Sequence, residues 1–121
     1  MENLTNIFSA LSDPIRLRIL ALIAKETELC VCELVGALQL PQPKISRHCK
    51  VLSEANLLTS RREAQWVLYS LADTLPSWSK QALSAAVEGI QQDAQYAKDC
   101  ERLTAVVRPP VRYDGGEKQA C

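Results

Sequence analysis

Hydrophobic residues recur at intervals of three and four along the first half of the chain, which predicts amphipathic helices. The spacing defines four helices, whose apolar positions are, in order, Leu4, Ile7, Phe8 and Leu11; Ile15, Ile19, Leu22 and Ile23; Val31, Leu34, Val35 and Leu38; and Ile45, Cys49 and Leu52. Ser12-Asp13-Pro14 supplies a cap residue and a proline for the start of the second helix. Residues 40–43, Leu-Pro-Gln-Pro, are expected to separate the third helix from the fourth. Asn56 is expected to end the fourth, because asparagine tolerates the left-handed conformation.

The hydrophobic period changes after residue 56. Residues 57–61 and 66–71 predict two short strands, the second with alternating Val67, Tyr69 and Leu71, and residues 62–65 would form the hairpin tip. Pro76 fits the first turn of a long final helix over about residues 75–103. This helix carries a stripe of small residues, which suits either packing against its own core or a dimer seam: Ala82, Ala85, Ala86 and Gly89.

The order of elements is helix, helix, short helix, turn, helix, hairpin, helix. This order predicts a mainly α fold with one β-hairpin, a winged helix-turn-helix, in which the second helix of the motif enters the major groove of DNA. We expect one domain over residues 1–104. We expect a mobile tail over residues 105–121, which contain Pro109-Pro110 and Gly115-Gly116.

Composition indicates the type of domain and where the chain is expected to be located. It has 121 residues, of which 47% are hydrophobic and 23% are charged, as is ordinary for one globular domain. Because no apolar run approaches the ~20 residues of a membrane span and the first residues do not form a secretory signal, a cytoplasmic location is expected. The 14 basic and 14 acidic residues give a net charge of zero, which by itself argues against a nucleic-acid partner.

The distribution of charge reverses that argument. Residues 42–65 hold five basic and two acidic residues, a local charge of +3 on a neutral chain. Many polar residues here are types that read bases or neutralise phosphates. The candidate DNA-binding residues are Gln42, Lys44, Ser46, Arg47, His48, Lys50, Arg61, Arg62 and Gln65. A solvent-exposed polar helix would show the same residue types, so the local charge decides between the two interpretations.

Five cysteines suggest a second kind of site. Cys30 and Cys32 lie at the expected start of the third helix, where a helix N-terminus favours thiolates, and thiolates select soft ions. Residues i and i+2 lie about 200° apart on a helix, so both sulfurs reach one ion only if the helix start unwinds. A disulfide between them would be strained, which disfavours a redox role. The alternative is that the two cysteines act only as small hydrophobic residues.

Four motifs, in this order, resemble the ArsR/SmtB family, and within it the arsenical-resistance repressors. They are residues 11–20 (LSDPIRLRIL), 28–34 (ELCVCEL), 42–48 (QPKISRH) and 61–67 (RREAQWV). The resemblance implies a homodimeric repressor that dimerises through its first and last helices. It also implies release from operator DNA when trivalent arsenic or antimony binds Cys30 and Cys32, with no required cofactor and no enzymatic activity.

The sequence departs from that family pattern at several positions. Such repressors often carry a third cysteine where this chain has Val35, so Cys100, Cys121, a water, a hydroxide or a small thiol is the candidate third ligand. Cys49 is expected in the core. Pro41 replaces a serine cap, and Ala64 replaces a glycine at the hairpin tip. The alternative function is thiol-based redox sensing, or sensing of another soft metal such as cadmium or lead, by the same fold.

Overall fold

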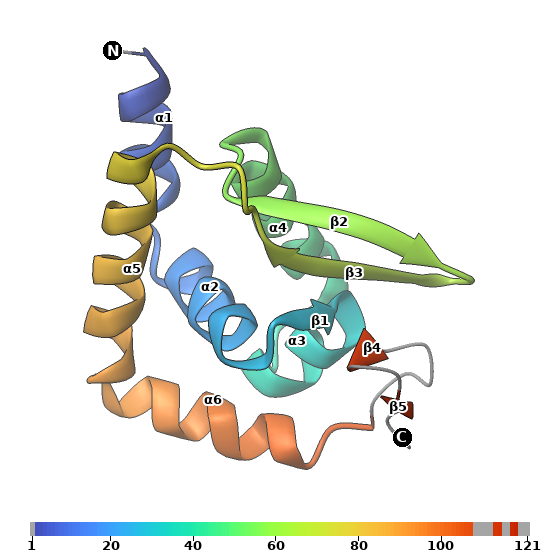
Figure 1. Ribbon diagram of the computed structural model, residues 1–121. Coiled ribbons are helices and arrows are strands. Elements are labelled where there is room, and N and C mark those ends of the chain that lie inside the picture. Colours follow the sequence, from blue (N-terminus) through green and yellow to red (C-terminus); the bar gives the residue numbers. More distant parts are fainter. Residues whose placement is uncertain (1, 108–112, 115–116, 119–121) are drawn as a thin grey trace.

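Six helices and a three-stranded sheet dominate the computed structural model, which describes residues 2–107, 113–114 and 117–118 (Figure 1). None of the helices in these residues is long and apolar enough to cross a membrane. The elements are α1 (Glu2–Ala10), α2 (Pro14–Glu26), β1 (Glu28–Cys30), α3 (Val31–Leu38), α4 (Gln42–Glu54), β2 (Leu58–Glu63), β3 (Trp66–Leu71), α5 (Ser77–Gln91), α6 (Ala94–Thr104), β4 (Tyr113–Asp114) and β5 (Glu117–Lys118).

The helix boundaries follow the capping residues of the sequence. Asp13 caps α2, because its Oδ1 accepts the N–H groups of Ile15 at 2.8 Å and Arg16 at 3.2 Å. Asn56 adopts a left-handed φ of 63° directly after α4, as predicted. Pro43 belongs to the first turn of α4, so the break between α3 and α4 is shorter than the sequence suggested. The predicted helix-turn-helix is therefore confirmed as α3 and α4.

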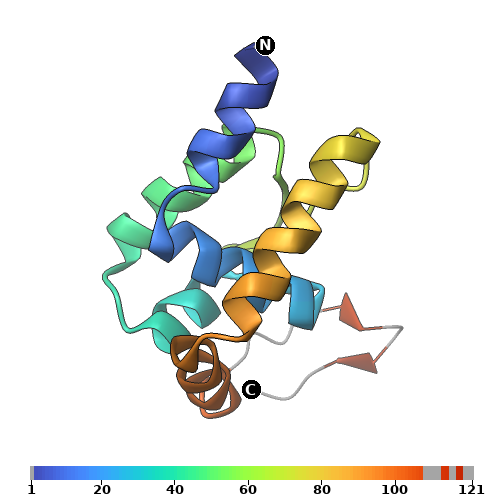
Figure 2. The same cartoon turned by 90° about the vertical axis from the view of Figure 1, so that its left-hand side faces the viewer.

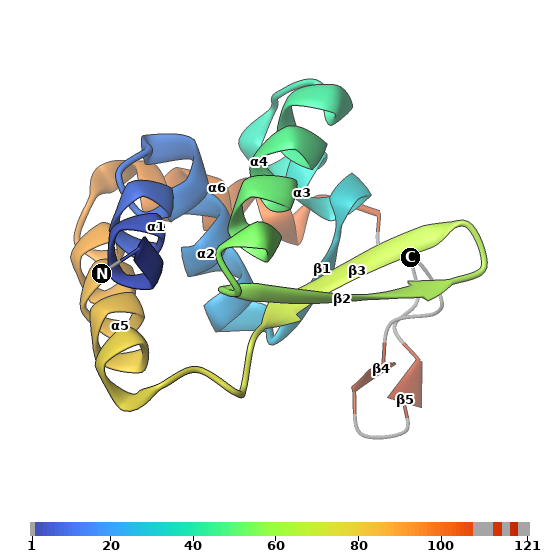
Figure 3. The same ribbon diagram turned by 90° about the horizontal axis from the view of Figure 1, so that it is seen from above.

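The predicted hairpin is confirmed, and a third strand joins it. The antiparallel sheet has the order β1-β3-β2, with Leu29 opposite Tyr69 and Cys30 opposite Leu68. The turn at the tip is shorter than expected, since β2 continues to Glu63 and only two residues separate the strands. Ala64, the first of these two, has a φ of 54°, a conformation that favours glycine. The hairpin projects away from the helices as a wing (Figures 1 and 3).

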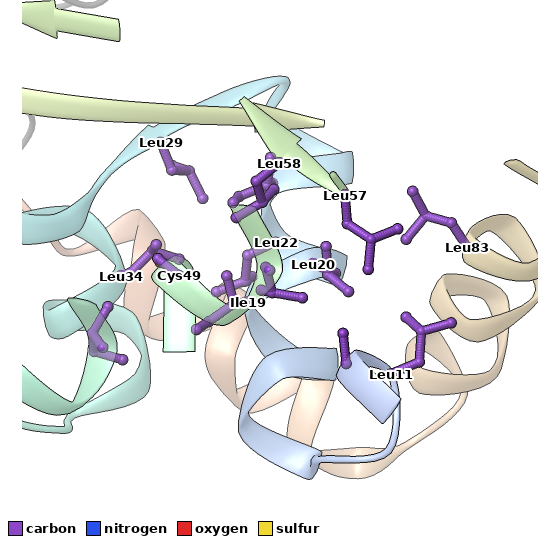
Figure 4. Close-up of a cluster of buried hydrophobic side chains, with 14 of the residues drawn as sticks. Leu11, Ile19, Leu20, Leu22, Leu29, Leu34, Cys49, Leu57, Leu58 and Leu83 are labelled. Atoms are coloured by element: carbon purple, nitrogen blue, oxygen red, sulfur yellow. The ribbon is translucent and has the colours of Figure 1, made fainter. Parts of the chain in front are cut away.

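The hydrophobic core lies between α2 and the elements around it. Residues 19–23 of α2 are fully buried, and they meet side chains from α3, α4, the sheet and α5 (Figure 4). Ile45, Cys49 and Leu52 form the buried face of α4, as their spacing predicted. This anchoring fixes which face of α4 points outward.

The predicted long final helix is wrong, because two helices occupy its place. α5 ends at Gln91, and Asp93 starts α6 by accepting the N–H of Gln95 on Oδ1 at 2.8 Å. The chain turns sharply here, so α6 crosses the end of the molecule and contacts α3 and α2 (Figures 1 and 2). The stripe of small residues lies on α5 alone. The expected tail falls largely outside the described residues.

A buried ion pair attaches α6 to α2. Arg18 Nε and Nη2 donate to the two carboxylate oxygens of Asp99, each at 2.9 Å, and Gln95 Nε2 donates to Asp99 Oδ1 at 3.0 Å. The Asp99 side chain is 1% exposed. Without Arg18, a carboxylate would remain buried without its cation.

Replacing Arg18 with Met should therefore lower the free energy of unfolding by about 3 kcal/mol, the usual cost of breaking a buried ion pair. Chemical denaturation measures this difference. Lys25→Gln, which removes the surface partner of Glu26, is the matched control and should cost less than about 1 kcal/mol. Equal losses in the two variants would show that the Arg18–Asp99 pair does not anchor α6.

Candidate DNA-reading surface and cysteine site

Helix α4 presents the polar face that the sequence predicted. Gln42, Arg47 and Lys50 are exposed, whereas Lys44, Ser46 and His48 are half-buried at the sides of the helix. The side-chain amide of Gln42 donates to Ser46 Oγ at 3.0 Å, one turn along. Pro41 is the N-cap residue and makes no side-chain capping bond. The first turn of α4 thus lacks a bond that α2, α3 and α6 possess.

His48 contacts the corner between α1 and α2. A guanidinium nitrogen of Arg16 lies 3.1 Å from His48 Nδ1, and Arg16 also donates to Ala10 O at 2.8 Å. Because arginine only donates, Nδ1 must accept, and the proton of neutral His48 is on Nε2. Partial burial lowers the pKa of His48; Asp13 opposes this shift, and nearby cations reinforce it. The network joins the reading helix to the rest of the fold.

Arg61 occupies a different setting from the other candidate DNA contacts. Its Nε and Nη2 donate to the carboxylate of Glu28 at 2.7 and 2.9 Å, and its Nη1 donates to Glu63 at 2.7 Å. The hydrogen bonds that Arg61 donates to Glu28 raise the pKa of Arg61. Two carboxylates offset this guanidinium charge, whereas Arg62 and Gln65 are exposed along the wing. Sequence reasoning missed the Glu28 contact, because it depends on the register of three strands.

The cysteine pair lies where β1 passes into α3. Cys30 ends β1 in an extended conformation and is the N-cap of α3, so only Cys32 lies within the helix. The expectation that both residues are helical, with side chains about 200° apart, is wrong. The two sulfurs meet without unwinding of α3, and the structure joins them as a disulfide with the Cα atoms 5.4 Å apart. The argument that helix geometry disfavours this bond is wrong for the same reason.

A capping box surrounds Cys30. Its Sγ accepts the N–H of Glu33 at 3.3 Å, and Glu33 Oε1 accepts the N–H of Cys30 at 2.9 Å. Cys30 is buried, whereas Cys32 is exposed. As a free thiol, Cys30 would have its thiolate stabilised by the same helix N-terminus.

A hollow of about 270 Å³ opens beside the two cysteines. Its walls come from three elements: the start of α3, the start of α4 and the wing. The lining residues are Cys30, Val31, Cys32, Gln42, Ser46, Gln65, Trp66, Val67 and Tyr69. Three of the candidate DNA contacts, one of them on the wing, therefore share a cavity with both candidate ligands.

The remaining cysteines are separate from this pair. Cys49 is buried in the core, as predicted, and burial raises the pKa of its thiol to about 12. Cys100 is half-buried on α6. Among the described residues, no group of three or more His, Cys, Asp or Glu side chains is arranged to hold a metal ion, so Cys100 does not join Cys30 and Cys32 within one chain. Cys121 lies outside the described residues.

This fold and its polar helix define a winged-helix transcriptional regulator, and the comparisons support that class. The family model described as "Bacterial regulatory protein, arsR family" matches residues 13–60. The arsenic resistance transcriptional regulator ArsR1 of Pseudomonas putida is 49% identical over 86 residues, which cover 71% of this chain and 67% of that protein. The arsenical resistance operon repressor of Escherichia coli strain K12 is 36% identical over 117 residues, which cover 95% and 92% of the two chains.

A solved structure supports the same fold. HlyU from Vibrio cholerae N16961 has a TM-score of 0.61 at 30% identity, over 75% of this chain and 90% of that one. The chain therefore belongs to the arsR family of transcriptional regulators. This membership confirms the expected winged-helix fold and the expectation of a regulator rather than an enzyme.

The pKa of His48 should lie below its ordinary value of 6.5. Since this is the single histidine of the chain, an NMR titration of its ring protons measures the midpoint directly. Arg16→Gln should raise the midpoint, because it removes a nearby cation, and Lys98→Gln on α6 should leave it unchanged.

The lowered pKa also fixes the direction of a stability change. The unfolded chain binds this proton more readily than the folded one, so His48 makes folding less favourable as the pH falls below about 6.5. A titration midpoint of His48 at or above 6.5 would contradict both the contact with Arg16 and the predicted loss of stability at low pH.

Proposed function

We propose that the protein is a metalloid-responsive repressor. It binds operator DNA as a homodimer and leaves it when trivalent arsenic or antimony binds the thiolates of Cys30 and Cys32. The observation that carries this proposal is the hollow shared by the cysteines, the start of α4 and the wing. Relatives named for arsenic or arsenical resistance support the choice of ion. Thiolates require a reducing compartment, which fits a cytoplasmic location.

In this proposal, α4 enters the major groove and the wing follows the adjacent backbone. Arg47 and Lys50 project from the exposed face of α4, and Arg62 and Gln65 from the wing. Arg61 contributes mainly by holding the wing to β1, since two carboxylates already offset its charge. Base and phosphate contacts on α4 then come from Gln42, Lys44, Ser46, Arg47, His48 and Lys50.

The dimer would use α1 and α5, which lie on the side of the molecule opposite the wing tip (Figures 1 and 3). Phe8 is 52% exposed, and Leu4 and Trp78 are also exposed large hydrophobic residues. A Cβ added at Gly89 would meet no atom within 4 Å, so packing inside one chain does not require this glycine. A small residue at this place fits close approach by a second α5. The proposed dimer interface therefore uses α5 and excludes α6, so it covers less of the chain than the predicted last helix would.

Binding of the ion would act on both reading elements. Two thiols displace two hydroxides from As(OH)₃, which forms two As–S bonds and releases two waters, while arsenic stays trivalent. The product occupies the space beside Gln42, Ser46 and Gln65. Cys30 is also paired with Leu68 in the wing, so a shift of Cys30 changes the position of the wing relative to α4.

A second candidate function is redox sensing, which the Cys30–Cys32 disulfide favours. Oxidation of the two thiols removes two electrons and two protons, and a peroxide would be the acceptor. DNA release by hydrogen peroxide without a metalloid would support this function. Release by arsenite under reducing conditions supports the first, and release by cadmium or lead supports sensing of another soft metal.

Arg47→Ala should weaken operator binding at least about tenfold and leave the dimer intact, because the side chain touches DNA and not the core. Fluorescence anisotropy with an operator selected from random duplexes measures the affinity, and sedimentation measures the dimer. If Arg47 contacts phosphate, the slope of log K against log salt should fall by about 2 per dimer. Lys98→Ala on α6 is the matched control, and equal effects of the two changes would refute the assignment of α4.

The double variant Cys30→Ser/Cys32→Ser should bind the operator as the unchanged protein does but fail to release it with arsenite or antimonite. Serine keeps the shape of the site and removes the soft ligand. Anisotropy during titration under reducing conditions measures release. Cys100→Ser is the control and should release normally, because Cys100 stands apart from the pair. Normal release by the double variant would refute the inducer site.

A further inference from the structure

The cysteine pair leaves one valence of a trivalent arsenic atom without a protein ligand. Cys30 and Cys32 supply two sulfurs, and Val35 occupies the position one turn after Cys32. Val35 packs against the core cluster and has no donor atom. Within the described residues, no third Cys, His, Asp or Glu completes a group. The described residues therefore leave the third bond of arsenic to another group, either a hydroxide or a substituent that the ligand carries.

The hollow beside the sulfurs is suited to an apolar substituent. Val31, Trp66, Val67 and Tyr69 contribute apolar surface to its walls. Its volume is about 270 Å³, whereas a cavity of about 150 Å³ accommodates benzene in another protein. A hydroxide ligand would leave these walls in contact with water. A methyl or aryl group would cover them, which is favourable for apolar surface.

We propose that the preferred ligands of this site are trivalent arsenicals that carry one carbon substituent, R–As(III), rather than inorganic arsenite. This inference rests on the proposed function and names the ligand class of its site. R–As(OH)₂ reacts with the two thiols of Cys30 and Cys32, forms two As–S bonds and releases two waters. Arsenic stays trivalent and the As–C bond is retained. The substituent then projects into the hollow between α4 and the wing.

The experiment uses Trp66 as a reporter, since it lines the hollow. Trp78→Phe removes the other tryptophan of the chain. Phenylarsonous acid, methylarsonous acid and arsenite are each titrated into the reduced protein, while fluorescence reports the affinity and mass spectrometry the adduct. We expect the phenyl compound to bind at least tenfold more tightly than arsenite, with the methyl compound between them. Each organic adduct should add one R–As unit and lose two protons.

Two sets of variants distinguish binding of the substituent in the hollow from the general affinity of trivalent arsenic for two thiols. Val67→Phe fills the hollow and should weaken binding of the phenyl compound at least tenfold more than binding of arsenite; Val67→Ala is its control. Val35→Cys adds a third thiol and should improve arsenite binding at least tenfold without improving binding of the phenyl compound, whereas Val35→Ala should not.

The outcomes distinguish this inference from the proposed function. If arsenite binds Cys30 and Cys32 as tightly as both organic compounds do, the preference for R–As(III) is wrong and the repressor function stands. An equal loss for the phenyl compound and arsenite in Val67→Phe also overturns the preference. If none of the three compounds requires these two cysteines, both proposals fail.

Discussion

The antiparallel pairing of β1 with β3 is the constraint that connects the cysteine pair to the DNA-reading elements. Cys30 is both the last residue of β1, opposite Leu68, and the N-cap of α3. It cannot move without changing a strand pair or the start of a helix. Arg61 adds a second connection, since it reaches from β2 past the middle strand to Glu28 on β1. A ligand that repositions Cys30 therefore acts on the wing and on the helix-turn-helix together.

The contacts that hold helix α4 differ along its length, and the proposed release of DNA by a small ligand would depend on this difference. Ile45, Cys49 and Leu52 anchor the middle and end of the helix in the core. Arg16 holds one side through His48. The first turn begins at Pro41 without a side-chain cap, and its Gln42 faces the hollow. The part of α4 that a ligand would meet is thus the part with the weakest local support.

Apolar spacing was sufficient to predict the first four helices, because each buries one regular face against a common core. It was insufficient where the structure depends on short or non-local features. Strand β1 has three residues, too few for an alternating pattern, so the sequence alone predicts Cys30 at the start of a helix. The break before α6 has one local cause, the cap at Asp93, within an otherwise continuous helical pattern. The pairing of Arg61 with Glu28 follows from strand register, which a single sequence does not state.

The structure also changes which of the cations between residues 42 and 65 are left to attract DNA. The sequence places five cations between residues 42 and 65, but two carboxylates offset Arg61. Lys44, Arg47, Lys50 and Arg62 remain to attract phosphates on a chain whose net charge is zero. Long-range attraction is then weak, and in the proposed homodimer the affinity would come from close contacts made by two copies of α4 at two half-sites. Close contacts depend steeply on position, so a displacement of the first turn of α4 in both copies affects such a complex far more than one held by diffuse charge.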